Sequence, residues 1–122
     1  MGFTVQWSKL IVYNDSNVKN NVNDSEKGGI YRLSHEVKDG KPTIFYVGKG
    51  KPLRGRLLDH FSEDEDNDCI TKKINNKKCY FKFAYVSGPK SRGCAERYMY
   101  DEIKPECNKV KPDSEPCEIN LN

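Results

Sequence analysis

The chain has 122 residues, of which 35% are hydrophobic and 11% aromatic, and its 21 Lys and Arg against 18 Asp and Glu give a net charge of +3. This length favours a single domain, and the aromatic residues supply enough apolar surface for a core, so a second folded domain and wholesale disorder are both excluded. A charge this close to balance does not by itself indicate a nucleic-acid-binding protein.

The sequence carries two signals about the compartment. No stretch approaches the roughly 20 apolar residues that cross a bilayer, and residues 1–10 lack the basic and then apolar pattern of a signal peptide. The 5 cysteines are odd in number, widely spaced and free of any C-x-x-C pair, which favours reduced, buried thiols over a zinc site assembled from distant cysteines. We therefore expect a soluble protein that is cytoplasmic or nucleoid-associated and not secreted.

The N-terminal part of the chain divides into an apolar stretch and a polar one. Residues 5–13 are predicted to form either an added strand or a lid over the core. Residues 14–28 are dense in Asn, Asp and Ser, whose side chains hydrogen-bond their own backbone, so this segment is predicted to be a loop.

A β-hairpin is predicted from two short runs of β-branched and aromatic residues, 29–35 and 43–48. The dipeptide Asp39-Gly40 between them is a strong hairpin signal, because a type I′ turn needs positive φ at both central residues. In such a turn Lys38 faces Lys41, and the numbers of antiparallel partners then add up to 79.

This register makes a prediction about two tyrosines. Tyr31 lies opposite Gly48, and Leu33 lies opposite Tyr46. Because side chains along a strand alternate between its two faces, Tyr31 and Tyr46 are predicted to project from the same face of the sheet.

A helix is predicted to begin at Pro52, with an apolar stripe at four-residue steps made by Leu53, Leu57 and Phe61. Arg56 and His60 are also four residues apart and lie on a neighbouring face, at the edge of the buried surface. The acidic run at residues 63–68 and the lysines that follow residue 70 are typical of a second helix, with anions at its start and cations at its end. A carboxylate metal cluster is the alternative for that run.

A third strand is predicted at residues 79–86, ended by Ser87-Gly88-Pro89. Ser91 is then placed to cap a last helix, which has apolar residues at helical spacing and ends before Pro105. The predicted order from residue 29 is therefore strand, strand, helix, helix, strand, helix.

This pattern resembles the GIY-YIG nuclease superfamily, which includes domains of phage homing endonucleases, of the incision subunit of bacterial nucleotide-excision repair and of some restriction enzymes. The matching residues are Gly29-Ile30-Tyr31, Tyr46-Val47-Gly48, Arg56, His60, Glu96 and Asn108. The resemblance implies an α+β fold, a small three-stranded antiparallel sheet flanked by helices, and agrees with the element order above. We divide the chain into an N-terminal extension at 1–27, a GIY-YIG nuclease-like domain at 28–110 and a C-terminal tail at 111–122.

The resemblance also implies a divalent-metal-dependent endonuclease that hydrolyses phosphodiester bonds in DNA. Glu96 then corresponds to the single carboxylate ligand of Mg²⁺ or Mn²⁺, and Arg56 to the cation that contacts the phosphate. Tyr31 and Tyr46 are the motif tyrosines, either of which serves as the general base. The remaining matches are His60, Asn108, the motif backbone at Gly29 and Gly48, and Lys49, a basic residue present in part of the superfamily.

The chemistry of these residues suits the reaction. Phosphodiester hydrolysis needs an in-line nucleophile, relief of charge on the phosphoryl oxygens and help for the leaving alkoxide. Mg²⁺ prefers oxygen ligands and keeps several waters, so one carboxylate such as Glu96 is sufficient. A tyrosine with a pKa of ~10 is a poor base at pH 7 unless nearby cations or a hydrogen bond from His60 lower that value. Asn108 either braces the site or contacts the substrate.

Basic residues around the first helix are expected to hold the DNA. Lys49, Lys51 and Arg54 lie close in sequence to Arg56 and are predicted to contact phosphates that flank the cleaved one. Residues 1–28 and 111–122 carry no DNA-reading motif, so selection of duplex or branched sites is expected to come from DNA structure, a partner protein or a homodimer. The alternative functions are a nucleic-acid-binding module of the same fold that does not cleave, and a thiol-based metal or redox protein.

Overall fold

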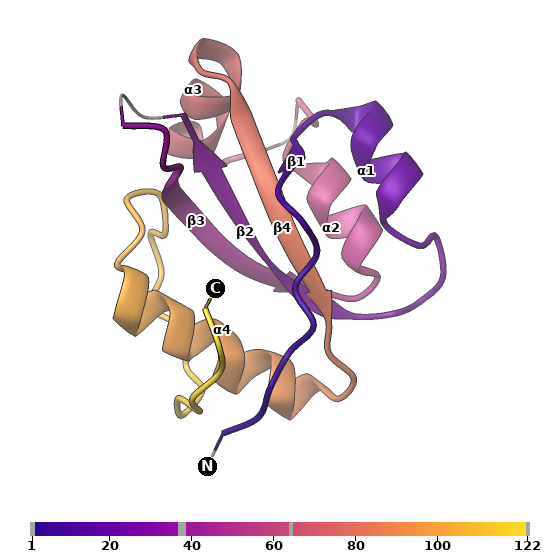
Figure 1. Ribbon diagram of the computed structural model, residues 1–122, viewed down its shortest axis with the longest axis vertical. Helices are drawn as coiled ribbons and strands as arrows, with labels where there is room; N and C mark the ends of the chain where they lie inside the picture. Colours follow the sequence, from indigo (N-terminus) through magenta and orange to yellow (C-terminus); the bar gives the residue numbers. More distant parts are fainter. Residues whose placement is uncertain (1, 37–38, 64, 122) are drawn as a thin grey trace.

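A four-stranded antiparallel sheet runs through the computed structural model, with the strand order β1-β4-β2-β3 (Figure 1). The structure describes residues 2–36, 39–63 and 65–121. The strands are β1 (Ile11–Val12), β2 (Gly29–His35), β3 (Thr43–Gly50) and β4 (Cys79–Tyr85). The helices are α1 (Asp15–Asn21), α2 (Leu53–Asp59), α3 (Asp68–Asn76) and α4 (Pro89–Ile103).

The predicted α+β class and the predicted order of elements from residue 29 onward are confirmed. The sheet has one strand more than the three predicted, because β1 pairs with β4 at the edge, with Ile11 opposite Phe81. Of the two alternatives for residues 5–13, the added strand is therefore confirmed at residues 11–12. Strand β2 lies in the middle of the sheet, bonded to both β3 and β4, and it carries the first motif tyrosine.

The predicted hairpin register is confirmed over the part that carries the tyrosines. Tyr31 lies opposite Gly48, and Leu33 lies opposite Tyr46. Beyond Leu33 the register shifts at a β-bulge, which leaves Phe45 as the extra residue of β3. The prediction of one unbroken register is therefore wrong beyond the bulge.

The predicted two-residue turn falls partly outside the described residues. The described pairing of β2 with β3 ends with His35 opposite Thr43. Gly40 does have the positive φ expected of it, at 77°. Lys38, expected opposite Lys41, lies outside the described residues.

Helix α1 lies where residues 14–28 were predicted to form a loop, so that prediction is wrong for residues 15–21. The side chain of Asn14 caps the helix by accepting a hydrogen bond from the N–H of Asn17 at 2.7 Å. Val18 and Val22, four residues apart, are buried in the core that α1 shares with α2. The polar residues favour turns locally, but this apolar pair lets tertiary packing stabilise a helix.

The later helices lie close to their predicted positions. Helix α2 begins at Leu53 with Pro52 as its N-cap. Helix α4 begins at Pro89 with Gly88 as its N-cap, so the prediction that Ser91 caps it is wrong. It ends at Ile103, before Pro105, as predicted.

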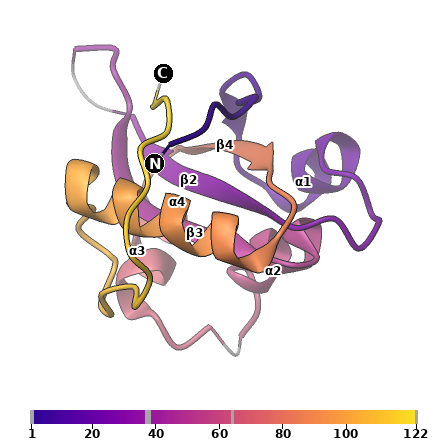
Figure 2. The ribbon, with the colours of Figure 1, turned by 90° about the horizontal axis from the view of Figure 1, so that it is seen from below.

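Two hydrophobic clusters cover the two faces of the sheet. The first lies against α1, α2 and α3 and includes Tyr31, Leu33 and Phe45. The second lies against α4 and the terminal segments and includes Ile30 and Val47. Figure 2 shows the C-terminal segment running over α4. The motif tyrosines and the helix that carries Arg56 therefore share the first face.

The N- and C-terminal segments bond to each other. The N–H of Phe3 donates to the carbonyl of Glu118 at 3.0 Å. The side chain of Asn120 accepts from the N–H of Val5 at 2.8 Å and donates to its carbonyl at 3.1 Å. Val5 and Ile119 are both buried in the second cluster, so both ends of the chain add to the packing of the sheet.

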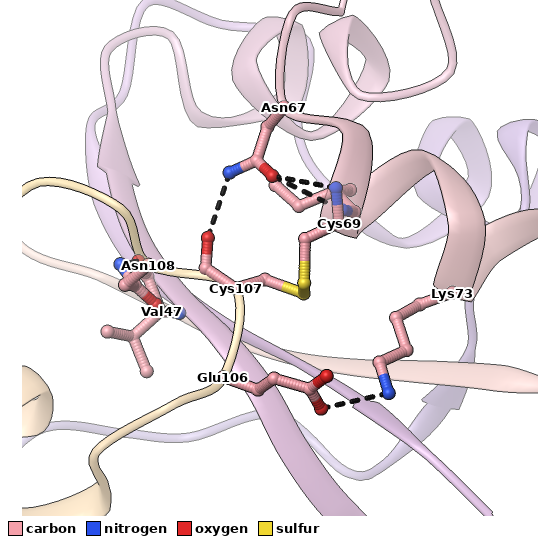
Figure 3. The surroundings of a disulfide bond; sticks show 8 residues. Val47, Asn67, Cys69, Lys73, Glu106, Cys107 and Asn108 are labelled. Atoms are coloured by element: carbon pink, nitrogen blue, oxygen red, sulfur yellow. Dashed lines mark hydrogen bonds and ion pairs between the residues drawn. A yellow bond between two sulfur atoms is a disulfide. The ribbon is translucent and has the colours of Figure 1, made fainter.

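The prediction of reduced thiols is wrong for the cysteines that form disulfides. Cys69 is bonded to Cys107, and Cys94 to Cys117, while Cys79 is free and buried. Figure 3 shows the first disulfide joining the start of α3 to the segment that follows α4. Because disulfides persist in oxidising surroundings, the thiol argument for a cytoplasmic protein no longer holds.

Candidate active site

The motif glycines Gly29 and Gly48, together with Gly50, permit close approaches that any side chain would block. A Cβ on Gly48 would lie 2.5 Å from both Cζ and the hydroxyl oxygen of Tyr31. A Cβ on Gly50 would overlap the side chain of Arg56, and one on Gly29 would overlap a carbonyl oxygen of β4. The glycines therefore bring Tyr31 and Arg56 against the sheet backbone.

A chain of hydrogen bonds leads from Tyr31 to the loop before α3. The hydroxyl oxygen of Tyr31, which is fully buried, lies 2.6 Å from Nε2 of His60. Nδ1 of His60 lies 2.7 Å from Oε2 of Glu65. The second oxygen of Glu65 accepts from the N–H of Asn67 at 2.9 Å. Both nitrogens of the motif histidine are therefore held by buried partners.

Tyr46, Arg56 and Glu96 line one cavity of about 480 Å³. The remaining lining residues are Glu65, Asp66, Asn67, Asn108, Lys109, Val110 and Pro112. The ring of Tyr46 lies 6.1 Å from that of Tyr31 and 5.3 Å from that of His60, measured between centroids. The predicted placement of the two tyrosines on one face of the sheet is thus confirmed, with Tyr46 on the cavity wall and Tyr31 behind it.

Asn108 is bonded to the edge strand β3. Its amide nitrogen donates to the carbonyl of Val47 at 2.9 Å, and its side-chain oxygen accepts from the N–H of Val47 at 2.9 Å. The neighbouring N–H of Cys107 donates to the carbonyl of Phe45, the bulge residue, at 2.7 Å. Both polar groups of the Asn108 side chain are therefore engaged with backbone, as expected of a residue that braces the site.

The basic residues near α2 differ in their surroundings. Lys49 and Lys51 are exposed, and the charge of Lys49 acts on Glu96 in the cavity. Arg54 instead turns toward α1, where it donates to the carbonyl of Lys19 at 3.0 Å and lies 3.4 Å from a carboxylate oxygen of Asp24. The structure thus places Lys49 at the site and holds Arg54 away from it.

Burial governs the titration of the phenols. It raises the pKa of Tyr31 and that of Tyr46, and the positive charge of Arg56 acts in the opposite direction on both. Neither phenol is therefore ionised at neutral pH in the resting site, and the loss of a phenol proton requires an acceptor or a further positive charge.

Burial also has the largest effect on the pKa values of His60 and Glu96. Burial lowers the pKa of His60, as does the charge of Arg56, while the hydrogen bond that His60 makes to the carboxylate of Glu65 opposes this shift. It raises the pKa of Glu96, against the charges of Lys49 and Arg56. His60 is thus neutral at pH 7, and the carboxylate of Glu96 would be stabilised by further positive charge.

Glu96 has the properties of a ligand for a divalent cation. Its carboxylate is half-buried on the cavity wall, and none of the described residues forms a hydrogen bond with it. A hard cation such as Mg²⁺ prefers oxygen ligands and accepts a single carboxylate together with waters. No group of three or more His, Cys, Asp and Glu is arranged to hold a metal ion within residues 2–36, 39–63 and 65–121. Glu96 is therefore the residue of this cavity that could hold such an ion.

Two residues of the site are not indicated by the sequence pattern. The acidic run predicts Glu65 at the start of a helix, whereas its side chain bonds to His60. Asn67 is the N-cap of α3, and its amide donates to the carbonyl of Cys107 at 2.9 Å (Figure 3). An Asn just before an amphipathic helix is a detectable capping signal, but no local pattern indicated that Glu65 turns inward.

Among the described residues, no helix is long and apolar enough to cross a membrane.

Comparison with known proteins gives partial matches to UvrABC system protein C from two organisms. The chain is 32% identical over 71 residues to UvrABC system protein C of Solibacter usitatus, and the aligned region covers 58% of this chain and 11% of that protein. It is 34% identical over 86 residues to UvrABC system protein C of Mycoplasmopsis agalactiae, and the aligned region covers 70% of this chain and 14% of that protein. No protein-family model matches the chain, and no solved structure matches it significantly. More than half of this chain is therefore similar to a small part of UvrABC system protein C.

Proposed function

We propose that this protein is a divalent-metal-dependent endonuclease that hydrolyses phosphodiester bonds in DNA. The observation that carries the proposal is the cavity shared by Tyr46, Arg56 and Glu96, with Tyr31 and His60 packed behind it. A phenol, a guanidinium and a carboxylate around one cavity are the groups that this hydrolysis needs. The similarity to UvrABC system protein C and the resemblance to the GIY-YIG superfamily support the same reaction class.

The two charged residues have complementary roles. Arg56 offsets the negative charge that builds up on the phosphoryl oxygens. Glu96 would hold Mg²⁺ or Mn²⁺, which supplies positive charge to the same oxygens and makes water a stronger nucleophile. Because Arg56 is bound into the wall by its packing against Gly50, it needs little reorganisation when the substrate binds.

One of the two motif tyrosines acts as the general base. Tyr46 borders the cavity and lies beside Arg56, whose charge favours its ionised form. Tyr31 lies behind it and has a direct acceptor for its proton in His60. Separate Tyr31→Phe and Tyr46→Phe variants distinguish them, because loss of the base lowers kcat far more than loss of its neighbour.

The substrate is duplex or branched DNA. Lys49 and Lys51 are exposed, and the charge of Lys49 acts on Glu96. In this proposal both lysines contact phosphates that flank the cleaved one. Such contacts do not read sequence, so a partner protein, a homodimer or the structure of the DNA selects the site. A cytoplasmic or nucleoid-associated location follows from such a substrate alone, because the two disulfides are typical of oxidising surroundings and do not support it.

Cleavage of supercoiled plasmid, with Mg²⁺ or with EDTA, tests the proposed function. Nicking is expected with Mg²⁺ and not with EDTA. The Glu96→Gln substitution is expected to abolish nicking while leaving the affinity for DNA and the fold nearly unchanged. Glu102→Gln, an exposed glutamate on the same helix, is the matched control and should cleave like the wild type.

Two results would count against this function. The absence of metal-dependent cleavage on duplex, branched and single-stranded DNA would overturn it, and tight binding to the same DNA would then identify a non-cleaving module. Wild-type activity in Glu96→Gln would remove Glu96 from the metal site.

A further inference from the structure

Glu65 is more enclosed than a residue of an acidic surface run would be. Its side chain is only 7% exposed and contacts the fully buried side chain of His60. It lies in the loop between α2 and α3 and borders the same cavity as Arg56 and Glu96. A carboxylate placed this deeply requires hydrogen-bond donors, and the structure supplies them from His60 and Asn67.

These contacts set the direction of the hydrogen-bond chain. A carboxylate accepts hydrogen bonds, and the N–H of Asn67 already donates to one oxygen of Glu65 at 2.9 Å. At 2.7 Å from the other oxygen, Nδ1 of His60 must then carry the proton. A neutral imidazole has one N–H, so Nε2 is an acceptor and the hydroxyl of Tyr31 donates to it across 2.6 Å.

We propose that Glu65 is a positioning residue of this site, which holds the proton of His60 on Nδ1 so that Nε2 can receive the proton of Tyr31. In that transfer the O–H bond of Tyr31 breaks, an N–H bond forms on Nε2, and the resulting imidazolium is balanced by the carboxylate of Glu65. No electrons are exchanged and no co-reactant is needed. A buried phenol thereby gains a destination for its proton without becoming an isolated anion.

Charged and titratable groups face His60 from each element around it. Arg56 and Asp59 lie on α2, Glu65 lies in the following loop, and the two motif tyrosines lie on the sheet. Glu65 is buried with His60, whereas Asp59 is exposed. Removal of the Glu65 carboxylate should therefore change the protonation of His60 more than the removal of any other acidic residue nearby.

The first test reads the imidazole directly. In ¹⁵N-labelled protein, long-range ¹H–¹⁵N correlation spectra distinguish a proton on Nδ1 from one on Nε2. We expect the Nδ1–H form for His60 at pH 7.5 in the wild type and in Glu63→Gln, an exposed glutamate of the same run. We expect a mixture of forms in Glu65→Ala. An Nε2–H form in the wild type would overturn the proposal, and this result does not depend on nuclease activity.

The second test concerns cleavage and rests on the proposed function. Glu65→Gln keeps the shape of the side chain, so it tests the charge without opening a cavity. We expect kcat to fall at least tenfold, KM for plasmid DNA to stay within about twofold, and the acidic limb of the kcat profile to move to lower pH, because Glu65 raises the pKa of His60. A merely structural role would not move that limb. An unchanged kcat and pH profile in a Glu65→Gln variant that folds normally would overturn the proposal, whereas inactivity of the wild type would count against the proposed function alone.

Discussion

Replacement of Gly48 by alanine tests whether this motif glycine is needed to admit the ring of Tyr31. The added Cβ would lie 2.5 Å from both Cζ and the hydroxyl oxygen of Tyr31, whereas ordinary contact begins at 3.4 Å, so the ring must retreat by about 1 Å. Tyr31 is fully buried and bonded to His60, so it has no free space to enter. Overpacking of this kind costs roughly 1–3 kcal/mol of unfolding free energy. A shift of about 1 Å at a reacting centre lowers the rate by roughly 100-fold.

Urea unfolding and plasmid nicking measure these two effects separately. Gly55→Ala is the matched control, because a Cβ there meets only a ring atom of Pro52 at 3.3 Å. Gly55 lies within α2, where alanine is favoured over glycine by up to about 1 kcal/mol, so this variant should be at least as stable as the wild type and equally active. Wild-type stability and rate in Gly48→Ala would refute the argument that the glycine is required for steric reasons.

Three further predictions follow from the site. Replacing Cys69 and Cys107 by serine should lower the unfolding free energy by roughly 2–4 kcal/mol, as urea melts would show, and should lower nicking by folded protein more than loss of the Cys94–Cys117 disulfide does. Asn108→Ala should cost about 1–3 kcal/mol in the same melts, because the N–H and carbonyl of Val47 lose their partners; an unchanged midpoint would show that water replaces them. Burial raises the pKa of Glu96, so the contribution of this carboxyl to the unfolding free energy is complete below the ordinary pKa of 4.5 and is lost as pH rises through the folded-state pKa. Because Mg²⁺ binds the ionised carboxylate, the rise in melting temperature that Mg²⁺ produces should grow from pH 5 to pH 7 and be absent in Glu96→Gln.

The sequence contained most of the information that defines the sheet and the first layer of the site. The alternation of residues in β2 and β3 put Tyr31 and Tyr46 on one face, because the period of a strand allows no other arrangement once Tyr31 lies opposite Gly48. The four-residue spacing of Arg56 and His60 likewise predicted a shared face near the core. Arg56 is partly exposed as predicted, whereas His60, the C-cap of α2, is buried and not at the edge. These features depend on periodicities that neighbouring residues encode locally.

Other features of the protein were set by contacts between residues far apart in the chain. The polar composition of residues 14–28 favoured a loop, and α1 forms because Val18 and Val22 find an apolar surface on the rest of the fold. The register predicted from the dipeptide Asp39-Gly40 holds at Leu33 and shifts beyond it at the bulge residue Phe45. The carbonyl of Phe45 accepts a hydrogen bond from the N–H of Cys107, far along the chain.

The inward turn of Glu65 and the pairing of Cys69 with Cys107 illustrate the same limit. In the sequence, Glu65 is one carboxylate in an acidic run, and the two cysteines are separated by 38 positions. Docking of the segment after α4 against β3 and the start of α3 brings Cys107 to Cys69. Glu65 is close to His60 in the chain, but only the burial of His60 in the fold gives that carboxylate an enclosed partner. Local propensity sets which elements form, but the partner of a buried polar or sulfur group is fixed by the packing of those elements, which no single stretch of sequence contains.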